Sequence, residues 1–545
     1  MLGLMQTRPL MISSILRHAA QNHATTEIVS KTVEGVLHRT TYAETERRTR
    51  RLVRILQDLG VGASDRVGTL AWNGFRHFEL YYAVPGMGAV CHTINPRLGL
   101  DDLAYIVNDA GDVLLFADTT FAPLLASLAP RTPTVRAVVM MTDRANMPDV
   151  ALPSGIPLLC YEDLMEAADD GFEWPEFDEQ TASGLCYTSG TTGRPKGVLY
   201  SHRSTVLHAY AINMPDVMGY SAVDRTMPVV PMLHVNAWGA PFAAPLVGAA
   251  LIMAGRHLDG ASVAELMNTE RVTTSAGVPT IWLGLLQHLR GSGTRLDTVK
   301  RLVIGGSACP PMLIEAFGRE YGVRVDHAWG MTETSPLGTY NRPKAAPMSE
   351  AAAASRALNQ GRGIYGIEMK IVNDANETLP WDGVAFGNLM VRGHWVCNRY
   401  FGPNALGGAD ADGWFATGDV ATIDAEGYME ITDRSKDVIK SGGEWISSIT
   451  LENIAVAYPD VAEAAIIAAY HPKWDERPLL LVVPKEGKTI DTDALLASYR
   501  GHVPNWWLPD AVVSLPELPR TATGKLNKLA LRLKWGRHLT DPVAS

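Results

Sequence analysis

The chain has 545 residues, of which 46% are hydrophobic and 19% are charged, and its formal net charge is −10. This length exceeds one ordinary hydrophobic core, so we expect a globular protein of at least two domains, and the composition excludes a disordered chain. The negative charge argues against a nucleic-acid-binding protein, because such proteins are usually basic. The five cysteines lack CxxC spacing, which predicts reduced, mostly buried thiols and no zinc site.

The sequence shows neither a secretion signal nor a membrane span. Its first ten residues contain no long apolar run behind a basic segment, so we expect no signal peptide. The longest apolar run, residues 240–254, is shorter than the ~20 residues of a spanning helix, and it contains Pro241, Pro245 and Gly248. We therefore expect this run to lie in the core of a cytoplasmic protein without a transmembrane segment.

Helical and strand-like patterns alternate along the N-terminal part of the chain. Apolar residues recur at helical spacing over residues 52–59 and stop at Gly60, which predicts a helix that ends there. Short apolar runs bounded by polar, Gly or Pro residues predict strands. The alternation predicts α/β layers with largely parallel sheets. The predicted strands cover residues 67–71, 113–116, 138–141, 249–254 and 302–304.

The stretch that carries the most chemistry runs from Thr188 to Gly197 and reads TSGTTGRPKG. Its glycines let the backbone approach a ligand closely, its hydroxyl and N–H groups can line a nest for anionic oxygens, and Lys196 adds a positive charge. It differs from the common P-loop, because no Ser or Thr follows Lys196. We predict a phosphate-binding loop of another type, and the alternative is a flexible linker. The phosphate-binding residues would be Thr188, Ser189, Gly190, Thr191, Thr192, Gly193 and Lys196.

Three polar stretches downstream are further candidates. Glu333 follows a strand-like run, and its carboxylate suits Mg²⁺. Asp419 lies in a tight Thr-Gly-Asp turn, where it can accept hydrogen bonds from both hydroxyls of a ribose. A charged run at residues 433–437 precedes a smaller unit with apolar runs of its own at residues 464–468 and 479–483. Taken alone, Glu333 and the charged run are more typical of exposed segments, and a Thr-Gly-Asp turn is common in proteins.

Together these stretches resemble the acyl-adenylate-forming enzymes, which include acyl-CoA synthetases, adenylation domains and beetle luciferases. The resemblance covers essentially the whole chain, and residues 72–97 resemble the medium- and long-chain acyl-CoA synthetase branch, which includes 3-methylmercaptopropionate-CoA ligases. It implies a large N-terminal multi-sheet α/β domain (residues 1–432) and a small mobile α+β C-terminal domain (residues 439–545). The implied hinge is residues 433–438, with Asp433 and Lys436 as hinge residues.

The resemblance implies an ATP-dependent, AMP-forming ligase. A carboxylate is a poor acyl donor, so these enzymes couple it to the α-phosphate of ATP and then pass the acyl group to the thiol of coenzyme A. Glu333 and Thr188 would hold Mg²⁺, and Lys525 matches the lysine that bridges carboxylate and phosphate. The implied catalytic residues are Lys525, His234, Thr188 and Glu333. The implied ATP- and AMP-binding residues also include Gly305, Gly306, Ser307, Trp329, Gly330, Met331, Thr332, Asp419 and Arg434.

Two substrate channels follow from the same resemblance. A glycine-rich wall would line the coenzyme A tunnel, and the small domain would turn to present this tunnel after adenylation. In the acyl site, His234 would border the carboxylate and Trp238 would gate an acyl tunnel, although packing is the alternative for its apolar neighbours. The implied tunnel residues are Lys440, Ser441, Gly442, Gly443, Glu444 and Trp445. The implied acyl-pocket residues are His234, Val235, Trp238, Gly305 and Trp395.

The substrate and the assembly are predicted less directly. Residues 231–238 contain no Asp or Glu to pair with an α-ammonium, which favours an apolar acid, such as a short- or medium-chain fatty acid or 3-methylmercaptopropionate. The alternatives are a long-chain fatty-acid–CoA ligase, a carrier-loading adenylation enzyme, a luciferase-like oxygenase, and a binding protein without activity. Relatives in this branch are often homodimers, so we expect a homodimer. Thr450 replaces the usual acid of a capping box, which predicts a slightly weaker helix start.

Overall fold

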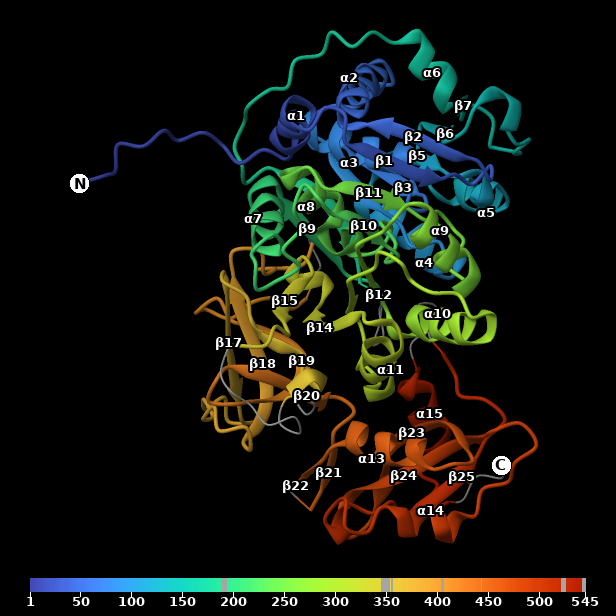
Figure 1. Cartoon of the computed structure of the whole chain (residues 1–545), viewed down its shortest axis with the longest axis vertical. Coiled ribbons are helices and arrows are strands. Elements are labelled where there is room, and N and C mark those ends of the chain that lie inside the picture. Colours follow the sequence, from blue (N-terminus) through green and yellow to red (C-terminus); the bar gives the residue numbers. More distant parts are fainter. Residues whose placement is uncertain are drawn as a thin grey trace. The chain divides into compact units, whose positions relative to one another are not determined.

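The computed structural model describes residues 1–188, 194–344, 353, 356–402, 406–442, 444–520 and 526–541. The chain divides into two compact units, and each is described by itself (Figure 1). Unit 1 contains residues 1–188, 195–368 and 392–415, as far as they are described. Unit 2 contains residue 194, residues 369–391 and the described part of residues 416–545. The predicted hinge at residues 433–438 concerns a motion, so it stays a prediction.

The first sheet of unit 1 has the strand order β7-β6-β5-β3-β4-β8-β9. Neighbouring strands run parallel, except that β8 and β9 pair antiparallel. Most of these strands are buried apolar runs, as expected for a parallel sheet that is covered on both faces. The strands predicted at residues 67–71, 113–116 and 138–141 are confirmed. The strands are β3 (Arg66–Leu70), β4 (Val90–Thr93), β5 (Asp112–Ala117), β6 (Ala137–Met140), β7 (Leu158–Cys160), β8 (Ala182–Tyr187) and β9 (Gly197–Ser201).

The second sheet of unit 1 has the order β16-β15-β14-β13-β12-β10-β11-β1-β2. Its centre, from β14 to β1, is parallel, whereas β2, β15 and β16 pair antiparallel. The predicted strands at residues 249–254 and 302–304 are confirmed here. The strands are β1 (Glu27–Lys31), β2 (Leu37–Thr41), β10 (Arg225–Pro228), β11 (Ala250–Met253), β12 (Thr274–Gly277), β13 (Arg301–Ile304), β14 (Arg324–Gly330), β15 (Leu337–Tyr340) and β16 (Gly361–Gly363).

Helices cover the two sheets of unit 1, and α3 lies between them. Nearly every residue of α3 is buried, and the helix contacts β4 and β8 of the first sheet and β1 of the second. The helices are α1 (Ile12–Asn22), α2 (Tyr42–Asp58), α3 (Phe75–Gly86), α4 (Leu100–Ala110), α5 (Ala122–Leu128), α6 (Tyr161–Ala167), α7 (His202–Ile212), α8 (Ala240–Val247), α9 (Gly260–Thr269), α10 (Pro279–Ser292) and α11 (Pro311–Tyr321). Short 3₁₀ helices are η1 (Thr119–Phe121), η2 (Ala129–Arg131), η3 (Arg144–Asn146), η4 (Val235–Gly239) and η5 (Thr332–Thr334).

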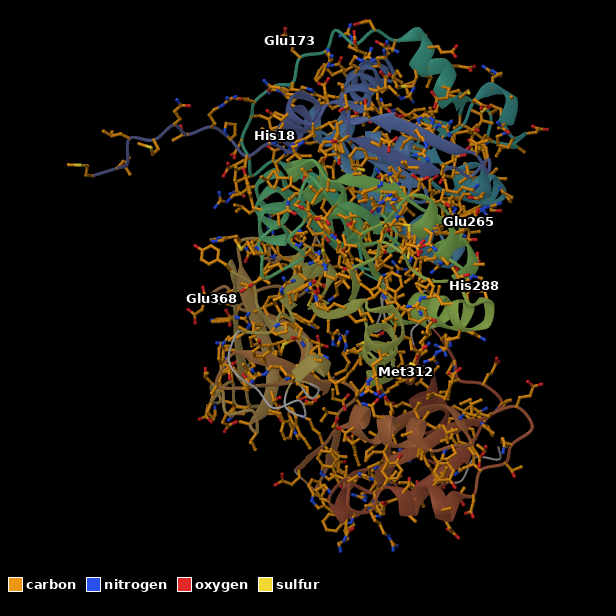
Figure 2. All side chains as sticks on the ribbon, in the orientation of Figure 1. His18, Glu173, Glu265, His288, Met312 and Glu368 are labelled. Atoms are coloured by element: carbon orange, nitrogen blue, oxygen red, sulfur yellow. The ribbon has the colours of Figure 1, made fainter. Side chains whose placement is uncertain are left out.

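Local sequence accounts for the ends and faces of these helices. Thr41 caps α2 by accepting a hydrogen bond from the N–H of Glu44, and α2 ends at Asp58, just before Gly60 with its φ of +77°. On α9, Glu265 stands on the outer side (Figure 2), whereas Val263, Ala264 and Met267 are buried. Among the described residues, none of the helices combines the length and hydropathy of a membrane span.

Unit 2 contains most of four neighbouring strands, β17 to β20, and all of a smaller sheet. The four strands have the order β17-β18-β19-β20, and the smaller sheet has the order β22-β21-β24-β23, with β25 also paired to β24. The strands are β17 (Ile367–Val372), β18 (Phe386–Gly393), β19 (Phe415–Ile423), β20 (Tyr428–Arg434), β21 (Ile439–Ser441), β22 (Glu444–Ile446), β23 (Val461–His471), β24 (Asp475–Pro484) and β25 (Ala511–Ser514). The helices are α13 (Ser448–Ala457), α14 (Thr492–Ser498), η6 (Asn505–Trp507) and α15 (Lys528–Trp535).

The predicted fold class is confirmed, with a large multi-sheet α/β part and a smaller α+β part. In the smaller sheet, β24 separates two buried apolar clusters, one on each face. At the start of α13, Ser447 accepts a hydrogen bond from the N–H of Thr450 at 3.2 Å. The hydroxyl of Thr450 lies 3.0 Å from the same Ser447 oxygen, so the cap persists without the acid of a full capping box.

Candidate active site

The two ends of the predicted phosphate loop are held together by hydrogen bonds. The N–H of Thr188, which follows β8, donates to the carbonyl of Lys196 at 2.9 Å. The N–H of Lys196, which precedes β9, donates to the hydroxyl of Thr188 at 3.2 Å. These bonds extend the antiparallel pairing of β8 with β9 to the loop ends. The predicted loop residues Ser189, Gly190, Thr191, Thr192 and Gly193 lie outside the described residues.

The side chain of Lys196 lies against a tyrosine that the sequence analysis did not single out. Its Nζ donates to the carbonyl of Leu406 at 3.1 Å and stands 4.7 Å from the centroid of the Tyr400 ring. The hydroxyl of Tyr400 in turn donates to Oε1 of Glu333 at 2.6 Å. The loop lysine and the candidate magnesium ligand therefore share one aromatic neighbour.

Glu333 lies in η5, directly after β14, and only 6% of it is exposed. Its backbone carbonyl accepts the N–H of Cys397 at 2.7 Å, and the carbonyl of Thr332 accepts the hydroxyl of Tyr200 at 2.8 Å. Burial and the nearby Glu333 charge raise the pKa of the Cys397 thiol to about 12. The Glu333 carboxylate therefore lies in a low-dielectric environment, where its negative charge acts strongly on neighbouring groups.

At Gly330, in the turn before Glu333, no space is left for a side chain. A Cβ on Gly330 would stand 1.9 Å from the carbonyl oxygen of Pro336. Trp329 packs across Gly338, where a Cβ would lie 2.4 Å from the indole ring. The N–H of Met331 donates to the same Pro336 carbonyl at 3.0 Å. These contacts fix the path of the predicted nucleotide-binding segment of residues 329–332.

The predicted magnesium ligands Glu333 and Thr188 supply a carboxylate and a hydroxyl, which are hard oxygen donors of the kind that this cation prefers. Within the described part of the chain, no group of three or more His, Cys, Asp or Glu side chains is placed to hold a metal. A magnesium ion would therefore take most of its ligands from substrate phosphates and water, which is its usual arrangement at nucleotide sites.

The predicted acyl-site segment adopts a left-handed turn. Four consecutive non-glycine residues of η4 have positive φ: 46° at Val235, 53° at Asn236, 45° at Ala237 and 55° at Trp238. Non-glycine residues disfavour this conformation by roughly 1–2 kcal/mol each. Half-buried His234 stands immediately before the turn. Such a run persists only where neighbouring structure imposes it.

Two predicted acyl-pocket residues meet at this turn. The indole of Trp238 lies against Gly305, where a Cβ would stand 2.9 Å from the ring atom Cη2. Gly305 follows β13, and the next residue, Gly306, has a φ of +80°. Ser307 is exposed. The absence of a side chain at Gly305 is therefore what admits the tryptophan ring.

Asn73 and Tyr81 form hydrogen bonds to residues within this turn or just before it. The hydroxyl of Tyr81, on α3, donates to the carbonyl of Met232 and to Oδ1 of Asn236, the latter at 3.1 Å. The Nδ2 of Asn73 donates to the carbonyl of Val230 at 2.9 Å, and its Oδ1 accepts the N–H of Met232 at 2.6 Å. Asn73 and Tyr81 lie in the segment that resembles the family branch, but no pattern in the sequence predicted that they brace this turn.

Trp395 is a core side chain with one polar anchor. It is only 4% exposed, its indole N–H donates to the carbonyl of Leu337 at 3.0 Å, and its ring covers Gly366. The N–H of Leu337 donates to Nε2 of His208 at 3.2 Å, and burial lowers the pKa of His208 to about 3. A Cβ on Gly239, at the end of η4, would stand 2.8 Å from this imidazole. His208 therefore links Trp395 to the acyl-site turn.

In unit 2, the predicted ribose-binding pair is brought together. Asp419 and Arg434 are register partners in the antiparallel pair of β19 and β20, and Nε of Arg434 lies 2.9 Å from Oδ1 of Asp419. Asp419 is 2% exposed, and its N–H donates to the hydroxyl of Thr417 at 3.1 Å. Gly418, between Thr417 and Asp419, has a φ of +75°, which turns the strand at this point. The Asp419 carboxylate is thus held in one orientation.

The predicted hinge residue Asp433 is tied to α13. It is 1% exposed and lies in β20, which continues to Arg434. Its Oδ1 accepts the hydroxyl of Ser448 at 2.9 Å, and burial raises the pKa of the Asp433 carboxyl although Lys528 opposes that shift. Burial lowers the pKa of Lys436. Their hinge roles stay predictions.

The predicted coenzyme A wall forms the hairpin of β21 and β22. Lys440 pairs with Trp445 across this hairpin, and its Nζ stands 4.9 Å from the Trp445 ring and 3.0 Å from a carboxylate oxygen of Asp374. Gly442 has a φ of +61° and packs against Trp474, and Ser441 is buried. An open pocket of about 340 Å³ is lined by Asn373, Asp374, Ala375, Phe386, Glu444 and Trp445. Gly443 and the predicted catalytic Lys525 lie outside the described residues.

Comparison with known proteins assigns the family. Residues 16–401 match the sequence model described as AMP-binding enzyme, and residues 450–525 match the one described as AMP-binding enzyme C-terminal domain. The chain belongs to the AMP-binding enzyme family, and within it to the acyl-CoA ligases, which use ATP and coenzyme A.

Two relatives are similar over their whole length. The chain is 52% identical to 3-methylmercaptopropionyl-CoA ligase of Ruegeria lacuscaerulensis, with 99% of this chain and 100% of the relative covered. It is 49% identical to medium-chain-fatty-acid–CoA ligase of Ectopseudomonas oleovorans, with 98% of each chain covered. Both relatives are named as CoA ligases, in agreement with the assignment of the chain to this group.

Solved structures show the same fold. The anthranilate CoA ligase AuaEII, crystallised with anthranoyl-AMP, aligns with a TM-score of 0.83 at 22% identity, over 98% of this chain and 99% of that one. ATP-bound MatB from Rhodopseudomonas palustris aligns with a TM-score of 0.80 at 23% identity, over 96% and 99%. At such identities the likeness concerns the fold alone.

Proposed function

We propose that this ligase activates an apolar, uncharged carboxylic acid of short or medium length, such as a medium-chain fatty acid or 3-methylmercaptopropionate. The acid would first become an acyl-adenylate and then a coenzyme A thioester. The observation that carries the proposal is the acyl-site turn, in which Trp238 fills the space beside Gly305. The whole-length relatives, named for 3-methylmercaptopropionate and medium-chain fatty acids, support the same substrate class.

The first half-reaction joins the acid to AMP. A carboxylate oxygen attacks the α-phosphorus of ATP, and pyrophosphate leaves. Lys196 and the loop N–H groups would hold phosphate oxygens, and Asp419 would accept hydrogen bonds from the ribose hydroxyls. Glu333 and Thr188 would hold Mg²⁺, which supplies positive charge to the phosphate oxygens. Lys525 would bridge the carboxylate and the phosphate, as the family resemblance implies.

The second half-reaction moves the acyl group to sulfur. The coenzyme A thiol, on losing its proton, attacks the acyl carbon, and AMP leaves with the electron pair of the C–O bond. The predicted coenzyme A wall, residues 440–445, would line the path of the thiol. We propose that the small domain turns about residues 433–438 between the two steps.

The acyl-site segment favours an acid without an α-ammonium. Residues 231–238 contain no carboxylate, and His234 and Asn236 are the polar side chains within them. Removing an unpaired ammonium from water costs several kcal/mol, so an amino acid would bind poorly at this segment. This reasoning also separates the chain from carrier-loading enzymes that activate amino acids.

The cysteines and the family resemblance bear on location and assembly. All five cysteines are free, and four of them are buried, as the sequence predicts. Free thiols are typical of the reducing cytoplasm, which supports a cytoplasmic enzyme. A homodimer is proposed from the resemblance to the acyl-CoA synthetase branch.

A panel of acids tests the substrate. We would measure AMP formation with coenzyme A for acetate, butanoate, octanoate, hexadecanoate, 3-methylmercaptopropionate and 2-aminooctanoate. The expected order places octanoate, butanoate or 3-methylmercaptopropionate first, with 2-aminooctanoate at least about a hundredfold below octanoate. A preference for hexadecanoate would favour the long-chain alternative, and a preference for the amino acid would overturn the proposal.

Paired variants show whether Trp238 sets the length. Trp238→Ala empties the space beside Gly305, so it should move the preference toward longer acids without changing the KM for ATP. Trp174→Ala is the matched control, because Trp174 packs against Gly86 and donates to the carboxylate of Glu46 rather than lying against Gly305. An unchanged chain-length profile in Trp238→Ala would contradict this assignment. Light emission with oxygen would instead indicate the luciferase-like alternative.

A further inference from the structure

Tyr400 joins the phosphate loop to the turn that carries Glu333. Its hydroxyl donates to Oε1 of Glu333 at 2.6 Å, and Nζ of Lys196 stands 4.7 Å from its ring centroid. One side chain therefore contacts two groups that the proposed function assigns to the metal and to the phosphates. These groups come from segments far apart in the sequence.

The backbone around Tyr400 makes the same connection. The N–H of Cys397 donates to the carbonyl of Glu333 at 2.7 Å, and the N–H of Phe401 donates to the carbonyl of Gly197 at 2.8 Å. Gly197 directly follows Lys196, and a Cβ on it would press against Phe401. Residues 397–401 are thus fastened at one end to η5 and at the other to β9, so the position of Tyr400 is fixed by both.

The hydroxyl of Tyr400 supplies a hydrogen-bond donor to the buried carboxylate of Glu333. Glu333 is 6% exposed, and a buried carboxylate oxygen without a donor is unfavourable by several kcal/mol. The phenol hydroxyl of Tyr400 donates to Oε1 of Glu333 at 2.6 Å, and this hydrogen bond favours one orientation of the carboxylate.

The ring of Tyr400 has a second task. The Lys196 ammonium rests over its face and also donates to the Leu406 carbonyl at 3.1 Å. A cation over a tyrosine face gains about 0.5–2 kcal/mol, depending on solvent exposure. The ring thereby limits the directions in which this otherwise flexible and exposed side chain points.

We propose that Tyr400 is a positioning residue that orients the Glu333 carboxylate for Mg²⁺ through its hydroxyl and the Lys196 ammonium for ATP phosphate through its ring. This inference rests on the proposed function of the site and adds a residue to it. The two roles belong to different parts of one side chain, so substitutions can separate them.

The test uses Tyr400→Phe, which removes the hydroxyl and keeps the ring, and Tyr400→Leu, which removes both. Binding of α,β-methylene-ATP to the full-length protein is measured calorimetrically with and without Mg²⁺. In the wild type, Mg²⁺ should tighten binding, and Tyr400→Phe should lose about tenfold of that tightening while its affinity without Mg²⁺ stays within about twofold. Tyr400→Leu should in addition weaken binding without Mg²⁺ by about threefold to tenfold.

Tyr161→Phe is the matched control, because Tyr161 also donates to a buried carboxylate, that of Glu79, at a distant place in unit 1. It should lower the thermal midpoint and leave the effect of Mg²⁺ unchanged. Equal Mg²⁺ effects in Tyr400→Phe and the wild type, or an equal loss in Tyr161→Phe, would overturn the inference. Failure of the wild type to bind the nucleotide would instead reject the proposed function itself, so the two failures are distinguishable.

Discussion

At the scale of single residues, Asp419 shows how a pair of strands can prepare a binding group. Its partner across β19 and β20 is Arg434, and the guanidinium holds one carboxylate oxygen at 2.9 Å. This ion pair and the burial of Asp419 fix the orientation of the carboxylate that we propose accepts hydrogen bonds from the ribose hydroxyls.

Asp419→Asn tests this assignment. The amide keeps one acceptor but loses the charge and the second acceptor, so the KM for ATP should rise about tenfold or more, while the KM for the acid stays within about twofold. Steady-state kinetics at saturating coenzyme A would measure both constants. Asp424→Asn, which alters a hairpin aspartate that accepts the N–H groups of Glu426 and Tyr428, should leave both constants unchanged. An equal rise in both variants would contradict the ribose role.

His208 makes the structure sensitive to acid. Burial lowers its pKa to about 3, whereas an unfolded histidine titrates near 6.5. Between these values the unfolded chain binds more protons than the native protein, so stability rises with pH and is lost as the pH falls. His208 alone should reduce the free energy of unfolding by ~2 kcal/mol between about pH 7 and about pH 5.

Replacement of His208 by Gln should remove this contribution, because the glutamine oxygen can accept the N–H of Leu337 and does not titrate. Urea unfolding of both proteins at the two pH values measures the difference. The other buried histidines are common to both proteins, so they cancel in the comparison. An identical acid sensitivity of the variant and the wild type would show that His208 is not the neutral acceptor described here.

The residue types around Lys196 indicate a phosphate loop by themselves, whereas the metal role of Glu333 and the ribose role of Asp419 depend on the family resemblance. All three roles stay predictions, although the structure describes the surroundings of these residues. Tyr400 could not be predicted in the same way, because its two partners come from distant segments and meet it only through the fold. The family resemblance assigned Trp238 and Gly305 to one acyl pocket, but their contact was not predicted.

At the scale of elements, the acyl-site turn is the least predictable piece of backbone. The apolar runs that form β3, β5, β6, β11 and β13 were predicted because burial on both faces leaves a readable signature. Residues 235–238 contain no glycine, so nothing in them indicates four positive φ values. The turn is held from outside: Tyr81 donates to the Asn236 side chain within it, and Asn73 and Tyr81 form hydrogen bonds with the backbone of residues 230 and 232 just before it.

Tyr81→Phe should therefore act on the acid and not on ATP. Without the hydroxyl, the Met232 carbonyl and the Asn236 side chain lose a donor, which costs about 1–3 kcal/mol and loosens the strained turn. We expect the KM for the carboxylic acid to rise about tenfold while the KM for ATP stays within about twofold. Initial-rate kinetics with each substrate varied in turn would measure the split.

Tyr82→Phe is the control for this variant. Tyr82 is the next residue of α3, and its hydroxyl donates to the carbonyl of Pro241 in α8 at 2.7 Å, outside the turn. Both variants should lower the thermal midpoint, but Tyr82→Phe should leave the KM for the acid unchanged. Equal increases in this constant would mean that general destabilisation of α3, rather than bracing of the turn, explains the effect.

At the scale of the whole molecule, the two half-reactions should be separable by mutation. Lys525→Ala should reduce pyrophosphate exchange about a hundredfold or more, because the positive charge that bridges carboxylate and phosphate is lost. The same variant should still convert supplied acyl-adenylate to the thioester at near the wild-type rate. Gly443→Leu should show the reverse pattern, because a side chain on the tunnel wall obstructs the thiol and leaves ATP untouched.

Lys488→Ala is the control for these variants. Lys488 is an exposed lysine of unit 2, paired with Asp460 at 3.4 Å, and its loss should alter neither half-reaction. Each half-reaction is assayed with purified protein, acyl-adenylate and coenzyme A as required. An equal loss of both steps in either Lys525→Ala or Gly443→Leu would remove the case for two alternating arrangements of the small domain.

The central strand of the small sheet, β24, determines how the amide hydrogens of this sheet exchange with solvent. Along β24, Leu480 and Val482 enter one apolar cluster, and Leu479 and Leu481 enter the cluster on the opposite face. Its backbone is paired with β23 on one side and with β25 on the other. The amide hydrogens of residues 479–482 can therefore exchange with solvent only when both clusters separate together. They should be the slowest-exchanging amides of this sheet and report its global unfolding, while the hairpin of β21 and β22 exchanges through small local fluctuations.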